Sequence, residues 1–257
     1  MGRHRPGVAV LSVARTPPMD IERKPSGFYE WEADARFKRP LAVGIESRRL
    51  DACIARYNQA GMRGLFGNPD FGFREQDLDF LHRTKVKPVW LWFWDVDLKD
   101  VEALYGLTEL DHFGINPKRP GIDFSRFRRM TTVVNHWLKS DTGLAKAAIA
   151  EYYLWHFNPR SKSFAEVEIP LGVRRLQLTW ANPASLDGLP VLKNLTELQI
   201  HRCRNLADLS ALPRIAPHLR HLLATTSSRL VPKAGVLDHP KLETARIDGK
   251  EWLAHAG

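Results

Sequence analysis

The stretch from Leu195 to Leu212 reads L-T-E-L-Q-I-H-R-C-R-N-L-A-D-L-S-A-L. Its first part alternates between polar and apolar residues, which is the two-residue period of a β-strand, and this places Leu198 and Ile200 on one face. Its later apolar residues recur at every third position, a spacing that suits a 3₁₀ turn. The stretch therefore predicts a short strand followed by a tight turn.

The same phrase returns along the chain at intervals of 19 to 24 residues. A period in the low twenties is the signature of a solenoid, in which each coil buries its apolar residues against its neighbours. The first positions of the successive units are Met62, Val86, Leu107, Met130, Ile149, Val173, Leu195, Leu219 and Leu242.

This phrase, with its L-x-x-L-x-L core, resembles the leucine-rich repeat family over residues 62–257. The resemblance implies an α/β fold: a leucine-rich repeat solenoid of about nine coils, with a parallel concave β-sheet, short 3₁₀ or irregular turns on the convex side and an N-terminal strand and helix cap. His112 and Asn135 fall on inward positions, so the units that begin at Leu107 and Met130 are either distorted or out of register. Strands of about three to five residues are expected, centred near Leu65, Val89, Leu110, Val133, Tyr152, Leu176, Leu198, Leu222 and Ala245.

Residues 1–61 have a different pattern and form the predicted cap. Residues 29–37 alternate as in a half-buried strand, residues 40–46 predict a second strand, and Ser47 is the expected N-cap of a helix from Arg48 to about Asn58, which Gly61 would end. The first coil of a solenoid exposes an apolar edge, which a cap must cover. A small functional domain is the alternative. The apolar stretch 8–13 follows basic residues as in a signal peptide, but it is short and Arg15 follows it, so we predict a strand.

Composition narrows the possible classes. The 257 residues carry a net charge of +9, of which +4 lies in residues 1–60, +1 in 61–150 and +4 in 151–257. The chain has no apolar run of the roughly 18 residues that a membrane span needs. Its two cysteines, Cys53 and Cys203, lie in separate elements and are expected to be free thiols, which fits a reducing cytoplasm.

Aromatic residues crowd the outward strand positions of the first five coils, with acidic residues beside them. Tryptophan and tyrosine dominate binding hot spots, so this pattern predicts a contiguous exposed binding surface on the N-terminal half of the concave face. The predicted partner-binding residues are Phe66, Trp90, Trp92, Glu109, Asp111, Phe113, Glu151, Tyr153 and Trp155.

Three alternatives compete with that interpretation. Aromatic pairs between strands can simply stiffen a sheet. The N-terminal segment could fold over the rings and bury them. A slip of one residue in the run V-K-P-V-W-L-W-F-W would turn Trp90 and Trp92 inward.

The sequence contains none of the common catalytic or nucleotide-binding motifs, and the H-x-x-H pair His218 and His221 has no further ligand pattern nearby. We therefore expect no enzymatic activity, cofactor or metal. The family resemblance implies a monomeric interaction module that binds a protein or peptide, in its most specific form a small bacterial regulatory or immunity-type binder, with no membrane partner. The alternative is a nucleic-acid-binding protein that uses its basic ends and aromatic stacking, although the acidic residues beside the rings oppose a phosphate backbone.

Overall fold

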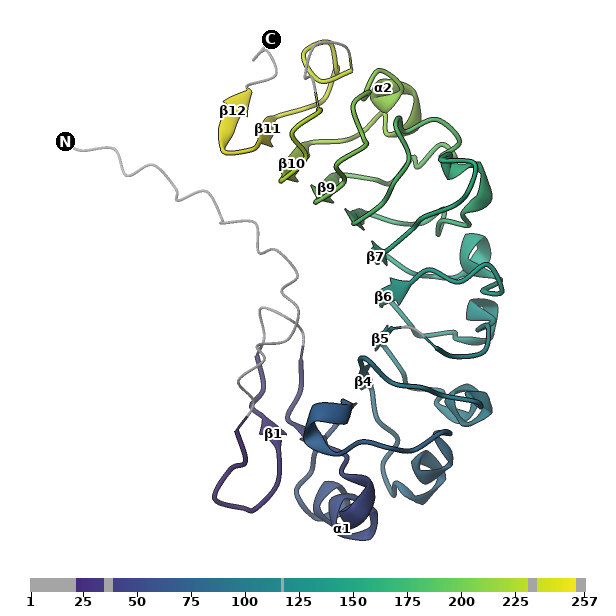
Figure 1. Ribbon diagram of the computed structural model, residues 1–257, viewed down its shortest axis with the longest axis vertical. Coiled ribbons are helices and arrows are strands. Elements are labelled where there is room, and N and C mark those ends of the chain that lie inside the picture. Colours follow the sequence, from purple (N-terminus) through teal and green to yellow (C-terminus); the bar gives the residue numbers. More distant parts are fainter. Residues whose placement is uncertain (1–21, 35–38, 117, 231–234, 253–257) are drawn as a thin grey trace, which may run out of the picture.

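The computed structural model describes residues 22–34, 39–116, 118–230 and 235–252. Within them the chain forms an open arc, with strands along the concave side and turns along the convex side (Figure 1). The strand predicted at residues 8–13 lies outside the described residues. The observed strands are β1 (Glu30–Trp31), β2 (Ala42–Gly44), β3 (Gly64–Gly67), β4 (Trp90–Phe93), β5 (His112–Ile115), β6 (Thr132–His136), β7 (Glu151–Trp155), β8 (Arg175–Thr179), β9 (Glu197–His201), β10 (His221–Thr225), β11 (Thr244–Ile247) and β12 (Lys250–Trp252).

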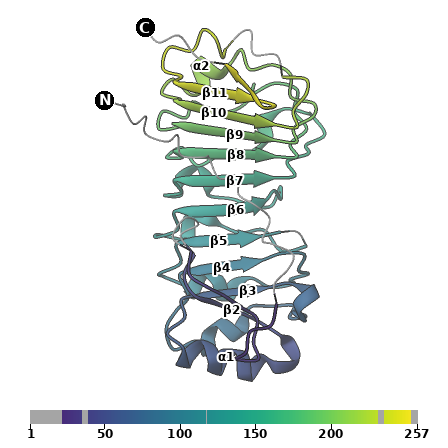
Figure 2. The same ribbon diagram turned by 90° about the vertical axis from the view of Figure 1, so that its left-hand side faces the viewer.

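The twelve described strands make one sheet in which the spatial order follows the chain order. Each strand from β2 to β11 pairs in parallel with the next, while β1 and β12 close the two ends in antiparallel pairs. Figure 2 shows these strands stacked like rungs. This is the α/β solenoid with a parallel concave sheet that the repeat predicted, and the sheet continues from β2 into β3 without a break.

Inward side chains of the parallel strands β2 to β11 form one continuous core along the solenoid. Leu198 and Ile200 of β9 lie beside Leu176 and Leu178 of β8, and all four are buried. Seven of the nine predicted strand centres fall on the first of these inward positions, from Leu65 in β3 to Ala245 in β11. The repeat register is therefore correct for those seven coils.

The register was wrong in the coils of β4 and β5. The first inward residue of β4 is Leu91 rather than Val89, and that of β5 is Phe113 rather than Leu110. Val86, the predicted first position of the β4 unit, is 49% exposed. The run around β4 is apolar on both faces, so hydrophobic pattern alone could not fix its register.

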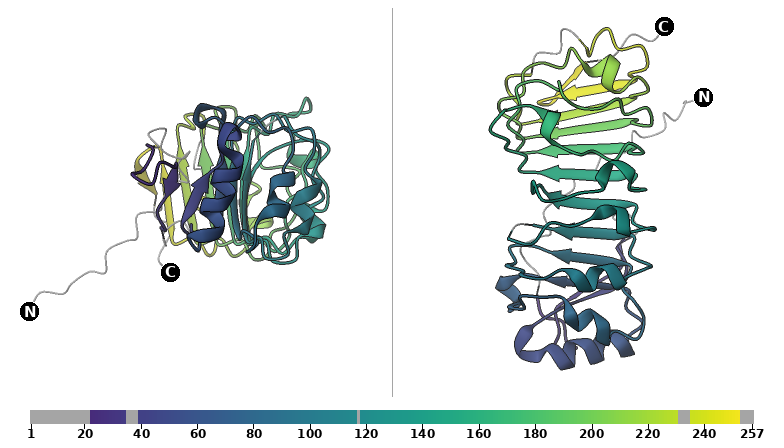
Figure 3. Two further views of the ribbon diagram at one scale, coloured as in Figure 1. Left: turned by 90° about the horizontal axis from the view of Figure 1, so that it is seen from below. Right: turned by 90° about the vertical axis from the view of Figure 1, so that its right-hand side faces the viewer.

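The convex side consists of short 3₁₀ turns, as predicted, and Figure 3 shows them on the outer face. The turns from η4 to η8 each bury one or two apolar side chains, such as Leu104, Phe124 and Phe164. The turns are η3 (Pro69–Phe71), η4 (Asp79–Arg83), η5 (Glu102–Gly106), η6 (Phe124–Arg126), η7 (Leu144–Lys146) and η8 (Phe164–Glu166), and the short helix α2 (Leu212–Ile215) takes their place before β10.

At the N-terminal end, η2 (Ser47–Arg49) leads into α1 (Leu50–Gln59), which lies across the end of the arc in Figure 3. The predicted N-cap role of Ser47 was wrong, because its hydroxyl instead accepts a hydrogen bond of 2.7 Å from the backbone N–H of Arg74 in the next coil. Gly61, with φ of 63°, does follow the helix end, where a left-handed residue is favoured.

Both cysteines are buried and free. Cys203 lies at the bend after β9 and Cys53 lies on α1. Among the described residues, no helix has the length and apolar character to cross a membrane.

Candidate functional site

The N-terminal half of the concave face carries a cluster of aromatic side chains, which we call the aromatic cluster: Trp31, Phe66, Trp90, Trp92 and Trp94. Trp31 of β1 stacks on Phe66 at a ring-centroid distance of 4.3 Å and on Trp94 at 5.7 Å, and it meets Trp90 edge to face at 5.8 Å. The cluster therefore joins the predicted outward rings of β3 and β4 to a ring from the cap.

Glycines in the neighbouring strands leave the space that these rings occupy. An added Cβ at Gly64 would lie 3.2 Å from the Trp90 ring, and one at Gly114 would lie 2.9 Å from the Trp92 ring. Each glycine is the register partner of the tryptophan beside it. The rings can lie flat on the sheet only because these positions have no side chain.

Residues 22–34, which contain β1 and which we call the N-terminal hairpin, cover the cluster. Ion pairs hold this hairpin in place. Arg56 of α1 reaches Glu30 of β1 at 2.8 Å, and Arg23 forms a two-pronged contact with Glu46 at 2.8 and 2.6 Å. Trp90 is consequently only 3% exposed, although it faces outward. The predicted exposure of Trp90 was wrong. The N-terminal segment folds over this ring, which is one of the three alternatives considered from the sequence.

The remaining predicted aromatic residues do not complete one patch. Phe113 points inward and is fully buried in the main core, so its predicted outward position was wrong. Its place on the concave face is taken by His112, which stacks on Trp90 at 5.4 Å and on Trp92 at 5.6 Å. Trp155 faces outward but is only 7% exposed. The continuous exposed surface expected from Trp90 to Trp155 is therefore absent from the described structure.

The predicted acidic residues lie on the concave side and are half-buried, each with a partner. Glu109 pairs with Arg129, and Asp111 accepts a hydrogen bond of 2.6 Å from Thr131. Glu151 pairs with Arg175 at 3.2 Å and accepts a hydrogen bond from the Tyr153 hydroxyl. Burial, with the Glu151 charge beside it, raises the pKa of Tyr153 to about 12.

The C-terminal half of the concave face is polar and internally paired. Arg175 also reaches Glu197 at 2.7 Å, and Gln199 donates to Glu197 at 2.6 Å. Two polar atoms are exceptions: the indole Nε1 of Trp155 and the amide Oε1 of Gln177 are buried without a hydrogen-bond partner. They lie on the adjacent strands β7 and β8.

Where the strands of this half end, four side chains stack into a column, which we call the His–Trp ladder: His136, His156, Trp180 and Arg202. The His136 and His156 rings are 4.6 Å apart, His156 and Trp180 are also 4.6 Å apart, and the Arg202 guanidinium lies 5.2 Å from the Trp180 ring. All three rings are half-exposed and Arg202 is exposed. None of their ring nitrogens takes part in a hydrogen bond within the described residues.

Both ladder imidazoles are held neutral by their surroundings. Burial lowers the pKa of His136 to about 4, with further contributions from His156 and Arg119, and burial also lowers the pKa of His156. The ladder thus presents neutral ring edges, with a single fixed charge at Arg202.

Three of the four ladder residues occupy left-handed backbone conformations. The φ angles of His156, Trp180 and Arg202 are 54°, 54° and 56°. Such a conformation costs a non-glycine residue about 1–2 kcal/mol. Asp95 and Thr226 adopt the same conformation at the equivalent positions of their coils, with φ of 57° and 53°, so the left-handed residue belongs to the bend that follows these strands.

Neither the ladder nor the contribution of Trp31 was predicted from the sequence. The available signal was the interval from His156 to Trp180 to Arg202, 24 and 22 residues, which matches the coil period. These residues directly follow the strands, one position beyond those assessed for the binding surface. Trp31 lay in the segment assigned to the cap.

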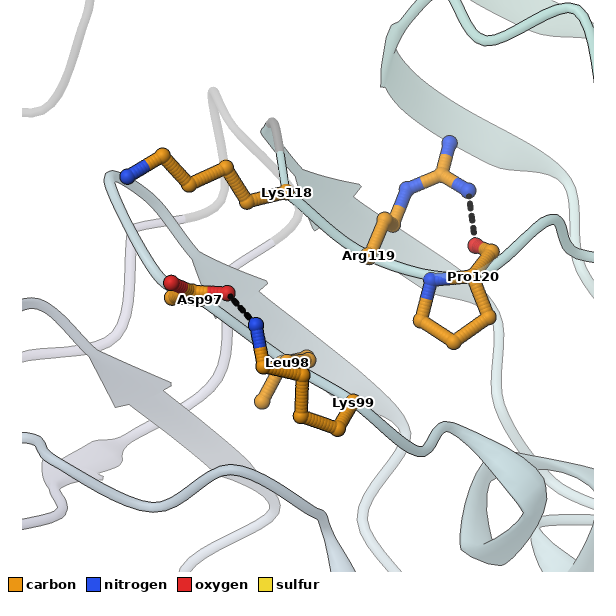
Figure 4. A pocket seen from close by; sticks show the side chains of 6 residues that line it. All are labelled: Asp97, Leu98, Lys99, Lys118, Arg119 and Pro120. Carbon is orange, nitrogen blue, oxygen red and sulfur yellow. Dashed lines mark hydrogen bonds and ion pairs between the residues drawn. The ribbon is translucent and has the colours of Figure 1, made fainter.

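A separate hollow of about 380 Å³ lies between the loops after β4 and β5 (Figure 4). Lys99 donates at 2.7 Å to Asp97 of the same loop, which lowers the pKa of Asp97. The Arg119 guanidinium points away from that pair (Figure 4) into a buried contact with Asp141. Asp97, Lys99 and Arg119 are thus engaged within the protein. The described residues contain no group of three or more side chains that could hold a metal ion.

Comparison with protein-family models, with curated proteins and with solved structures finds no significant match. The fold itself defines the class: a repeat solenoid with a single long, mostly parallel sheet.

Proposed function

We propose that the protein is a non-catalytic recognition module that binds a protein or peptide on the concave side of its solenoid. The repeat phrase still resembles that of leucine-rich repeat proteins, which serve chiefly as binding scaffolds; this is an argument from fold alone. The observation that carries the proposal is the His–Trp ladder, whose rings stack on one another and remain half-exposed beside the concave face.

The site we propose differs from the one expected from the sequence. The hairpin already covers much of the aromatic cluster, so we place the binding surface over β6 to β10, next to the ladder, where Arg175 and His221 are among the half-exposed residues. Tyr153 and Glu151 belong to this surface and remain half-exposed. Trp92 and the acidic pair Glu109 and Asp111 lie toward its N-terminal border.

A polypeptide suits the unpaired polar atoms of this face. Trp155 Nε1 is a donor and Gln177 Oε1 is an acceptor, and both lack a partner. A peptide unit carries one carbonyl acceptor and one N–H donor, so one extended segment can supply both complements. Both atoms are buried, so a partner pairs them only after the side chains around them move. The roughly 1–3 kcal/mol that each unpaired group costs would offset part of the cost of that movement.

The ladder gives less support to the nucleic-acid alternative. Single-stranded nucleic acids bind by stacking their bases on exposed ring faces. In the ladder the ring faces already contact one another, so mainly ring edges are available. The edges of these rings carry nitrogen atoms that can form hydrogen bonds with a polypeptide, and they can also pack against its side chains.

The test is capture of a partner from the native host with matched variants. Trp180→Ala should reduce recovery of a saturably bound protein at least tenfold, while Leu171→Ala, at another exposed apolar position, should leave it unchanged. Thermal melting of both variants would establish that they fold. Equal recovery with the folded Trp180→Ala protein would refute the ladder as the binding site.

A further inference from the structure

The edge of the sheet that contains the ladder has an unbalanced charge. Because β6 to β10 are parallel, the segments that follow them lie along one edge (Figure 2). These segments are residues 137–140, 156–163, 180–186, 202–207 and 226–230, and they contain no acidic residue. Their basic residues are Lys139, Arg160, Lys162, Arg202, Arg204 and Arg229, which we call the basic edge.

All six basic side chains belong to exposed residues, and none forms an ion pair within the described structure. The acidic residues next to these segments are already engaged. Asp141 is buried against Arg119, Asp187 lies 3.7 Å from Arg214, and Asp208 accepts from the backbone N–H of Ser210. Asp248 also reaches this edge, where it accepts from the backbone N–H of Ser227. Asp208 and Asp248 offset only part of the six positive charges, so the basic edge keeps a net positive charge.

On the same edge, the segment after β4 has the opposite charge, while the segment after β5 carries Lys118 and Arg119. The segment after β4 contains Asp95, Asp97 and Asp100, with Lys99 as its one basic residue. Charge therefore changes sign along the edge, from acidic beside the aromatic cluster to basic beside the ladder. A ligand with charge at one end would be oriented by this change.

We propose that the basic edge binds an extended acidic stretch of polypeptide, a run of Asp and Glu residues in the partner. This deepens the function proposed above and rests on it. Arginine guanidinium groups match carboxylates in a two-pronged geometry, and three exposed arginines besides Arg202 line this edge. The neutral imidazoles of the ladder offer ring nitrogens for hydrogen bonds and do not repel a carboxylate. The ring faces of the ladder already stack on one another, which leaves little room for the bases of a nucleic acid to stack.

The length of the acidic stretch follows from the fold. Four inter-strand steps separate β6 from β10, which is about 19 Å at ~4.8 Å a step. An extended peptide that rises ~3.3 Å per residue covers this distance with about six residues. An octapeptide is therefore long enough to reach every part of the edge.

The experiment uses the full chain and three dye-labelled probes: an octapeptide of glutamate, a neutral Gly-Ser octapeptide and an oligo-dT strand. Fluorescence anisotropy at low salt should show saturable binding of the glutamate peptide and none of the neutral peptide. Because the contacts are between exposed charges, added salt should weaken this binding. The glutamate peptide should bind more tightly than the oligo-dT.

The decisive variant is Arg202→Gln with Arg204→Gln, two exposed residues of one coil. If each contributes what an exposed ion pair usually does, the glutamate peptide should bind about 3- to 30-fold more weakly. The matched control is Arg128→Gln with Arg174→Gln, two exposed arginines outside the basic edge that form no ion pair within the described residues. It should change binding less than twofold, and both variants should melt within a few degrees of the native protein.

Two results would overturn this proposal. One is a native protein that does not bind the glutamate peptide at all, or an edge variant that binds it as tightly as the native protein does. The other is an oligo-dT strand that binds at least tenfold more tightly through the same two arginines, which would make the edge a nucleic-acid site. Either result leaves the proposed function standing if capture of a protein partner still depends on Trp180, so the two failures can be told apart.

Discussion

Asp141→Ala should destabilise the protein strongly, because it removes the counter-charge of a fully buried guanidinium. The Arg119 side chain is 0% exposed and that of Asp141 is 2% exposed. One Asp141 oxygen accepts from Arg119 at 2.6 Å and from the backbone N–H of Ile122 at 3.1 Å. The other accepts from Arg119 at 2.8 Å and from Asn135 at 3.0 Å.

The magnitude follows from these contacts. Removing one partner of a buried ion pair costs about 3–5 kcal/mol, since the remaining charge stays in a poorly solvating interior. Arg119 would keep its hydrogen bonds to Asn135 and to the carbonyl of Pro120, which moderate the loss. We therefore expect about 4 kcal/mol, near the middle of that range.

Urea unfolding followed by circular dichroism measures this loss, and hydrogen exchange of the β5 and β6 coils locates it. Coils of a solenoid are stabilised mainly by their neighbours, so the variant can unfold in two steps. The matched control is Asp187→Ala, whose exposed contact with Arg214 at 3.7 Å should contribute less than about 1 kcal/mol.

A second variant, Arg119→Met with Asp141→Leu, separates charge burial from packing. Replacing both ions by apolar residues should recover most of the loss, because neither charge then remains buried alone. A loss below about 1 kcal/mol for Asp141→Ala would refute the reasoning, as would a double variant no more stable than the single one.

The remaining predictions concern the core, the aromatic cluster and the cysteines. Leu198→Ala should cost about 2–5 kcal/mol in urea unfolding, and a loss below about half a kcal/mol would show that this inward side chain is not packed. Trp90→Ala should now cost about 3–5 kcal/mol, the reverse of the neutral effect expected for an exposed ring, and an unchanged melting temperature would contradict the covering role of the hairpin. Cys203 should resist thiol reagents at pH 8 until the protein unfolds, because burial raises its pKa to about 11. Because the thiol pKa is higher in the folded state, its contribution to stability is fully present below pH 9 and is lost as the pH rises toward 11. The Cys203→Ala protein should therefore lose less stability between pH 9 and 11 than the native protein does.

The sequence by itself determined the solenoid. The apolar residues that define each coil are buried within that coil and against its immediate neighbours. The sequence pattern that specifies the inward positions is therefore local and repeats in each coil. Leu198, Ile200 and Cys203 could therefore be assigned inward positions without any knowledge of distant parts of the chain. Even Asn135, an unusual inward residue, was placed correctly, and its burial is explained by the hydrogen bonds that it exchanges with Arg119 and Asp141.

Only the tertiary structure decided which outward residues remain accessible. Trp31 reaches Phe66 and Trp90 because the hairpin turns back over the concave face, a contact between distant segments that no repeat period encodes. The register of β4 was also undetermined, because the run Trp90–Trp94 offers apolar side chains to both faces of the sheet. The ladder appears only when the coils are stacked, since stacking brings His156, Trp180 and Arg202 from three successive coils into contact.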